Sequence, residues 1–350
     1  MAIIAIVGAG MMGTAMSWPL SDNKHQVRLV GTPLDEEVIL SIKNNRFHPK
    51  LQRNVPDGVE AYFYQDLASA LEGADGIISG VSSFGIEWFA QTVGSLIAPG
   101  VSVLSVTKGL EDQPNGDLFI LPDVLNGSMP LYKAGKISFN AIGGPCIAHE
   151  LAARRQTAVV FTGTNPEILE SFKKLLSTTY YHVWISTDVV GVETCAAMKN
   201  AYAMGVGMAV GMMEQNGPDG LANLYNPQAA LFGQSCYEMS KLVNIIGGSP
   251  ANVSWLPGAG DLFVTVFGGR TVSLGKLLGK GIPFSQAREI LAGVTLESVE
   301  IITRVCRALP KLEERGLASV KDFPFLLHMG DIVLNDRPVN IPWDKFFHQL

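Results

Sequence analysis

Lys199 and Lys108 are the two side chains whose surroundings suit proton transfer or the stabilisation of negative charge. Lys199 lies in an otherwise apolar helical run, where an ammonium group needs a partner, and Lys108 follows a β-rich run. Asp261 offers a carboxylate to Lys199, and Thr265 shares its face if that segment is helical. Such a set can exchange a proton with a substrate. The alternatives are a structural ion pair for Lys199 and Asp261, and a surface position for Lys108.

A glycine-rich turn near the start of the chain suits a nucleotide. The apolar run 3–7 leads directly into Gly8-Ala9-Gly10-Met11-Met12-Gly13. A strand, a glycine turn and a helix leave backbone N–H groups at the helix N-terminus to hold a pyrophosphate, and glycines let it approach. Plain packing of the turn is the alternative. We predict cofactor contacts at Gly8, Gly10, Met11, Met12 and Gly13.

The residues after the second β-rich run bear on the choice between NAD and NADP. That run ends in Leu29-Val30-Gly31-Thr32-Pro33, without the acidic residue that commonly takes the ribose hydroxyls. Asp35 comes later in the chain than that residue usually does. Thr32 has a hydroxyl that can donate to a 2′-phosphate. We therefore predict a nicotinamide cofactor with Thr32 in its site and leave NAD and NADP both open.

Two further glycine-rich strings are candidates for ligand contacts. The string 143–150 begins with Gly-Gly-Pro after a predicted strand, where a loop at the carboxyl edge of the sheet faces a bound cofactor. Gly268-Gly269-Arg270 places a guanidinium on a flexible loop, which suits bidentate binding of phosphate. An ordinary turn and a solvated surface arginine are the respective alternatives.

The pattern of elements predicts two domains. Short β-rich runs alternate with helical ones up to about residue 186, which is typical of helices crossing over a mostly parallel sheet. The β-rich runs are 3–7, 26–30, 76–80, 101–106, 138–142, 158–161 and 182–185. Helical stretches then follow at 190–214, 227–246, 285–308 and, more weakly, 320–333. We predict an α/β protein with a Rossmann-like doubly wound sheet in residues 1–186 and an all-α domain in residues 187–350.

Composition narrows the class of partner. The net charge of −6 and the pI near 5.6 argue against a broad nucleic-acid surface, which would be basic. The apolar stretch 201–213 is shorter than the ~20 residues of a membrane span, so we expect no stable membrane insertion. The four cysteines are widely scattered, which indicates neither a metal site nor a disulfide framework and favours reduced thiols in the cytoplasm. A homodimer is compatible with the sequence.

Five strings in a fixed order resemble those of the NAD(P)-dependent glycerol-3-phosphate dehydrogenases, particularly their archaeal-type branch. The resemblance runs from the first strand to about residue 300. The strings are the glycine fingerprint, Thr107-Lys108-Gly109-Leu110, Gly144-Pro145 with Ala148 and Glu150, Ala197-Met198-Lys199-Asn200, and Gly258-Ala259-Gly260-Asp261-Leu262 with Thr265.

This resemblance implies roles for the site residues. Lys199 is then the general acid/base at the C2 oxygen of the substrate, Asp261 and Thr265 position it, and Lys108 polarises the same oxygen. The implied substrate-binding residues are Asn200, Arg270 at the phosphate, and Thr271. The implied cofactor contacts, besides the glycine turn and Thr32, are Ala148, Arg270 and Glu297.

The chain also departs from the family pattern. Thr271 stands where the family has asparagine, and Val272 where bacterial members usually add an arginine. Threonine keeps one hydroxyl donor but lacks the amide. We therefore expect an oxidoreductase that interconverts glycerol 3-phosphate and dihydroxyacetone phosphate, with a larger polyol phosphate or ketose phosphate as the alternative substrate. A non-catalytic nucleotide-binding sensor is the rival class, against which the presence of Lys108, Lys199 and Asp261 argues.

Overall fold

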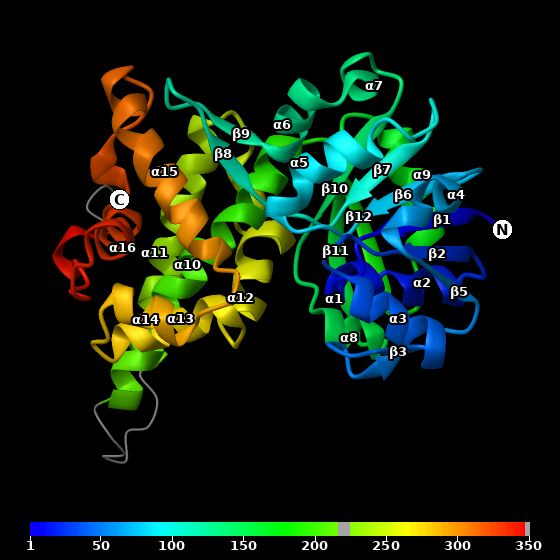
Figure 1. Ribbon diagram of the computed structural model, residues 1–350. Coiled ribbons are helices and arrows are strands. Elements are labelled where there is room, and N and C mark those ends of the chain that lie inside the picture. The colour runs from blue at the N-terminus through cyan, green and yellow to red at the C-terminus, as the bar shows by residue number, and fades with distance from the viewer. Residues whose placement is uncertain (216–224, 347–350) are drawn as a thin grey trace. The chain divides into compact units, whose positions relative to one another are not determined.

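The computed structural model describes residues 1–215 and 225–346 and divides into two compact units (Figure 1). Unit 1 comprises Met1–Lys108 and Leu121–Val189, and unit 2 comprises Gly109–Ile120 and Val190–Leu350. The predicted second domain, 187–350, includes residues 216–224 and 347–350, which lie outside the described part of the chain.

Unit 1 is built on an eight-stranded sheet with the order β12-β11-β10-β7-β6-β1-β2-β5. Every neighbouring pair is parallel except β10 and β11, which are antiparallel. The chain runs from β1 outward through β2 to β5 and then continues on the other side of β1 at β6, so the strand order reverses between β1 and β6. The strands are β1 (Ile3–Val7), β2 (Gln26–Val30), β5 (Val59–Tyr62), β6 (Gly76–Ser79), β7 (Ser102–Ser105), β10 (Ser138–Gly143), β11 (Thr157–Thr162) and β12 (Tyr181–Ser186).

Both faces of this sheet are buried. Along β1, Ile4 and Ile6 join one apolar cluster and Ala5 and Val7 join another, because successive side chains point to opposite faces. Burial on both faces explains why β1 is apolar at every position. The first cluster includes residues of α1 (Met11–Ala15), α2 (Ser17–Asp22), α3 (Glu36–Asn45), α8 (Ala148–Ala152) and α9 (Pro166–Leu176). The second includes residues of α4 (Leu67–Leu71), α5 (Ile86–Trp88) and α6 (Leu121–Ser128).

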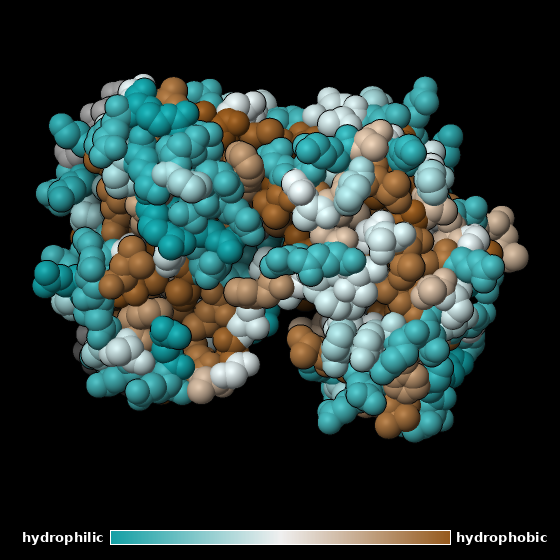
Figure 2. Space-filling model, turned by 45° about the horizontal axis from the view of Figure 1, so that its top comes forward, coloured by the Kyte–Doolittle hydropathy of each residue, from teal (hydrophilic) through white to brown (hydrophobic). Residues whose placement is uncertain are grey.

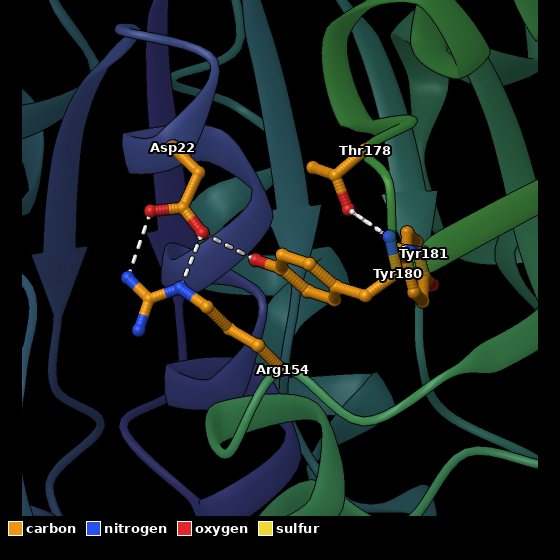
Figure 3. Close-up of polar contacts among 5 residues, drawn as sticks. All are labelled: Asp22, Arg154, Thr178, Tyr180 and Tyr181. Atoms are coloured by element: carbon orange, nitrogen blue, oxygen red, sulfur yellow. Dashed lines mark hydrogen bonds and ion pairs between the residues drawn. The ribbon is translucent and has the colours of Figure 1, made fainter.

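An arginine–aspartate ion pair, together with a tyrosine that donates to the same carboxylate, joins three separate segments of unit 1 (Figure 3). Arg154, after α8, donates from Nε and Nη2 to the two carboxylate oxygens of Asp22 at 2.7 and 2.8 Å, and the Tyr180 hydroxyl donates to Oδ2 at 2.6 Å. The hydrogen bond from Arg154 lowers the pKa of Asp22, and burial raises the pKa of Tyr180. The cluster connects the end of α2 to the segments that enter β11 and β12.

Unit 2 is mostly helical. Its helices are α10 (Val189–Gln215), α11 (Tyr225–Ile245), α12 (Asp261–Thr265), α13 (Arg270–Gly279), α14 (Phe284–Ile290), α15 (Glu297–Glu314) and α16 (Pro324–Asn335). The predicted single helix 285–308 is two helices, since Gly293 between them has φ +79°. Glycines bring α10 and α13 into close contact: a Cβ at Gly275 would lie 2.1 Å from the Met204 carbonyl oxygen. A bulky residue there would push the two helices apart.

Gly109–Ile120 falls within the predicted first domain, 1–186, but the structure groups it with unit 2. This segment forms the antiparallel hairpin β8 (Leu110–Asp112) and β9 (Leu118–Ile120), which lies beside α15 in Figure 1 and belongs to unit 2. Two arginines, one in α15 and one at its C-cap, hold this segment. Arg304 Nη1 donates to the Leu110 carbonyl at 2.6 Å, and Arg315 pairs with Asp117 at 2.7 Å.

A fully buried carboxylate organises the core of unit 2. Glu238 on α11 accepts from the backbone N–H groups of Phe325 and Leu326 at 2.7 and 2.9 Å, in the first turn of α16. The Tyr202 hydroxyl on α10 donates to it at 3.1 Å and Gln234 Nε2 at 2.8 Å. Burial raises the pKa of Glu238 to about 7, against the opposing effect of these four donors.

The raised pKa of Glu238 predicts a pH dependence of stability. The folded protein binds this proton more tightly than the unfolded chain, so the free energy of unfolding should fall as pH rises from about 4.5 to about 7. The loss attributable to Glu238 is about 3 kcal/mol across that window. We expect Glu238→Gln to lack this component. Urea unfolding followed by circular dichroism between pH 4.5 and 8 measures it, and parallel pH profiles of wild type and variant would contradict it.

Candidate active site

The glycine turn after β1 has one position that the protein leaves open. Gly8 has φ +109°, and a Cβ there would lie 2.7 Å from the Gly80 carbonyl carbon, while one at Gly13 would lie 2.4 Å from the Gly8 oxygen. Close packing therefore accounts for these two glycines. At Gly10 the nearest atom to a Cβ is the Gly80 oxygen at 3.8 Å. The protein itself does not require glycine at that position, so its small size fits the approach of a pyrophosphate.

The backbone amides in the first turn of α1 also suit a bound pyrophosphate. Gly10 is the N-cap of this helix, and α1 is followed almost directly by α2. The first N–H groups of a helix have no partner within it and carry its positive dipole end. The turn lies at the carboxyl end of β1, where the strand order reverses, which is the usual place for a dinucleotide in an open α/β sheet. The geometry of unit 1 thus fits a dinucleotide cofactor.

Asp35 lies closer to this turn than its place in the sequence indicated. Its Oδ2 accepts from Thr32 N at 2.9 Å, from Thr32 Oγ1 at 2.7 Å and from Ala9 N at 3.1 Å. Because a hydroxyl has one proton, Thr32 is already donating it, and its predicted donation to a 2′-phosphate would require that bond to break. Asp35 therefore belongs to the predicted cofactor region, although its late position in the sequence argued against a role there.

Lys108 and the string 143–150 meet at a small cavity of unit 1. The cavity, of about 20 Å³, lies at the carboxyl ends of β7 and β10. Its lining residues are Met12, Met16, Val106, Lys108, Ile142, Gly144, Cys146 and Tyr181. Ala148 follows as the first residue of α8 and is buried. A predicted catalytic lysine and a predicted cofactor contact, Met12, thus line the same cavity.

Lys199 and Asp261 form an ion pair in unit 2. The Lys199 ammonium on α10 contacts the Asp261 carboxylate at the start of α12, and their side chains are 12% and 1% exposed. The Thr265 hydroxyl donates to the Asp261 backbone carbonyl at 2.6 Å. Thr265 therefore shares the helix with Asp261, as the spacing predicted, but supports its backbone instead of its carboxylate.

The remaining predicted residues of unit 2 are the hydrogen-bonded pair Asn200 and Glu297 and the neighbours Arg270 and Thr271 at the start of α13. Asn200, next to Lys199, donates from Nδ2 to Glu297 Oε2 at 3.1 Å, so the predicted substrate residue and the predicted cofactor residue are in contact. Arg270 is exposed at the first position of α13, after Gly269, whose φ is +98°. Thr271, by contrast, is only 9% exposed.

Exposed aromatic rings accompany these polar groups. Hydrophobic residues reach the surface at several places on the face drawn in Figure 2. Phe263 and Phe267 are 56% and 74% exposed, and their ring centroids lie 4.9 Å apart in an edge-on arrangement. They stand in the same short segment as Asp261 and Arg270, so this part of unit 2 presents apolar surface beside its charged groups.

Residues 1–215 and 225–346 contain neither a side-chain cluster that suits a metal ion nor a helix that could cross a membrane. In those ranges no cluster of three or more His, Cys, Asp or Glu side chains suits a metal ion. No helix within them combines the length and the apolar character that crossing a membrane requires.

Two family models together match most of the chain and show which protein family it belongs to. Residues 3–169 match the family described as NAD-dependent glycerol-3-phosphate dehydrogenase N-terminus, and residues 188–342 match the corresponding C-terminus family. The chain belongs to the NAD-dependent glycerol-3-phosphate dehydrogenase family. Its fold, a parallel-sheet Rossmann-like unit with a mostly helical second unit, is the predicted α/β class.

Individual glycerol-3-phosphate dehydrogenases cover most of the chain. The NADP(+)-dependent glycerol-3-phosphate dehydrogenase of Archaeoglobus fulgidus is 34% identical over 292 residues, which is 83% of each chain. The glycerol-3-phosphate dehydrogenase [NAD(P)+] of Bacillus pumilus is 30% identical over 85% of this chain and 81% of its own. The crystal structure of the Coxiella burnetii enzyme aligns with a TM-score of 0.78 at 25% identity, covering 96% of this chain and 95% of that one. The predicted resemblance is thereby confirmed.

Proposed function

We propose that this member of the family interconverts glycerol 3-phosphate and dihydroxyacetone phosphate with NAD or NADP. The observation that carries the proposal is the Lys199–Asp261 pair, a largely buried ammonium held by a carboxylate on a neighbouring helix. In a family of dehydrogenases, the ammonium form of such a group can give a proton to the ketone oxygen on reduction, and its neutral amine form can take the hydroxyl proton of the alcohol on oxidation.

Each residue has a proposed role. Lys199 holds the proton that leaves or joins the C2 oxygen, and Asp261 orients and neutralises the ammonium. Lys108 stabilises negative charge on that oxygen. Asn200 and the exposed Arg270 hold the substrate, Arg270 at the phosphate and also near the cofactor, with Thr271 beside it. The cofactor, when bound, supplies or accepts the hydride.

Absorbance assays with NADH and NADPH test this function against its alternatives. The substrates are dihydroxyacetone phosphate and four- and five-carbon ketose phosphates. We expect the highest kcat/KM for dihydroxyacetone phosphate. A higher value for a longer ketose phosphate would establish the alternative substrate class that Thr271 suggested, and cofactor binding without turnover of any of them would establish the sensor.

Arg270→Ala should chiefly weaken use of phosphorylated substrate. Each charge-assisted hydrogen bond is worth about 1.5–3 kcal/mol, so loss of one predicts a fall of about 10- to 100-fold in kcat/KM for dihydroxyacetone phosphate. Unphosphorylated dihydroxyacetone should be a poor substrate of both proteins, with little difference between them. Arg288, exposed on α14, gives the matched control Arg288→Ala. Equal losses on both substrates would remove the phosphate role.

The location and the oligomeric state are also proposals. The four cysteines are widely spaced along the chain and form no CxxC pair, which supports a reducing compartment such as the cytoplasm. A homodimer is tested by light scattering of the purified protein.

A further inference from the structure

His48 is a fully buried histidine whose two ring nitrogens are both used. It lies in β3 (Phe47–His48), which pairs with β4 (Arg53–Asn54). Leu51 N donates to Nδ1 at 3.1 Å, so Nδ1 is the acceptor and the ring proton sits on Nε2. Nε2 lies 3.0 Å from the Ala9 carbonyl oxygen and donates to it. Burial lowers the pKa of His48, which keeps the ring neutral and this tautomer in place.

Ala9 is the residue between the first two glycines of the turn, and its other polar group is held as well. Its N–H donates to Asp35 Oδ2 at 3.1 Å, and Asp35 is itself fixed by the backbone and hydroxyl of Thr32. Gly8 N donates to the Val30 carbonyl at 2.8 Å. Both sides of the Ala9 residue are therefore fixed by side chains from the segment that follows β2.

A turn with three glycines has unusual backbone freedom, and a ligand that needs it in one conformation must otherwise supply the ordering free energy. We propose that His48 and Asp35 are positioning residues of the dinucleotide site, which hold both backbone polar groups of Ala9 and so preorganise the glycine turn for the pyrophosphate. This inference rests on the proposed function. It assigns no contact between either side chain and the pyrophosphate.

The pyrophosphate is common to NADH and NADPH, and this sets the expected result. His48→Leu removes the donor to Ala9 together with the acceptor for Leu51 N, and replaces the ring by an apolar side chain of similar size. We expect the Kd of both cofactors, measured by fluorescence titration of the full chain, to rise about 3- to 10-fold, with their ratio unchanged. KM for the cofactor should rise with little change in kcat. Hydrogen exchange without cofactor should become faster in peptides covering residues 8–13.

Two matched variants separate positioning from general destabilisation. His48→Gln can keep an amide donor near the Nε2 position and should restore the wild-type Kd to within about twofold. His25 accepts from Ala2 N at 3.2 Å, just before the other end of β1, so His25→Leu should leave the Kd unchanged. A folded His48→Leu protein that binds both cofactors as tightly as wild type would overturn the inference.

Asp35→Ala supplies an independent variant if His48→Leu does not fold. It removes the acceptor for the Ala9 N–H group, and we expect a higher Kd for NADH. An unchanged Kd for NADH would overturn the inference. Wild-type protein that binds neither cofactor would instead refute the proposed function, and the inference with it.

Discussion

Lys199→Ala should lower kcat by about two to four orders of magnitude while the protein still folds and binds its cofactor. This is the usual contribution of a positioned acid/base group. Lys199 is the ammonium that the structure holds against Asp261 with its side chain only 12% exposed. Steady-state kinetics with dihydroxyacetone phosphate measure kcat, and fluorescence titration measures cofactor binding. A rate within a few-fold of wild type would remove Lys199 from the mechanism.

The variant has a side effect that needs its own control. Removing Lys199 leaves the 1% exposed carboxylate of Asp261 without its ion-pair partner, which destabilises a protein by more than the pair itself contributes. The double variant Lys199→Met with Asp261→Asn removes both charges. We expect it to be more stable than Lys199→Ala and equally inactive. If turnover instead follows stability across the two variants, Lys199 and Asp261 are a structural pair.

A second control addresses nonspecific effects of removing a lysine. Lys276 forms an ion pair with Glu214 and its side chain is 38% exposed, so it lies in the same unit in a setting that has no proposed role in the reaction. Lys276→Ala should retain wild-type kcat. A loss in this variant comparable to that of Lys199→Ala would mean that the assay reports damage to unit 2.

The elements that were predictable from sequence are those whose burial leaves a local pattern. β1 matches the predicted run 3–7 because both of its faces are covered and every position is apolar. β2 matches the predicted run 26–30 through its buried Val27, Leu29 and Val30, with the partly buried Gln26 and Arg28 between them. The helix predicted at 190–214 is α10, Val189–Gln215. A helix that is buried on almost all sides has few polar positions, so its two ends can be read from the length of the apolar stretch. Lys199 stood out in the sequence for the same reason.

What the sequence did not reveal depends on contacts between distant segments. The strands of the hairpin Leu110–Asp112 and Leu118–Ile120 have three residues each, too few for a periodic signal. Arg304 in α15 and Arg315, directly after it, hold the hairpin. His48 contacts a residue 39 positions away, and nothing in its own neighbourhood indicates that partner. Asp35 did carry a local signal: an acidic residue three positions after Thr32 can accept from its backbone and hydroxyl in a tight turn.

Lys108→Ala should also lower kcat, by about two to three orders of magnitude, if this ammonium stabilises the charge that develops on the C2 oxygen. The backbone before Lys108 is held by hydrogen bonds. The preceding residue, Thr107, is buried, donates from its hydroxyl to the Val81 carbonyl at 2.7 Å and from its N–H to Ser105 Oγ at 3.1 Å. These bonds fix the chain where it leaves β7, so the lysine departs from a rigid point.

The kinetic pattern then separates a catalytic Lys108 from a structural one. A group that acts on the developing charge lowers kcat and kcat/KM together, whereas a group that binds substrate and transition state equally raises KM alone. We therefore expect kcat to fall in Lys108→Ala while the Kd of the cofactor and the melting temperature stay near wild type. Because Lys108 lines the same cavity as Met12, cofactor affinity is the sensitive check on local damage. A lower melting temperature with unchanged kcat would make Lys108 a structural residue of unit 1.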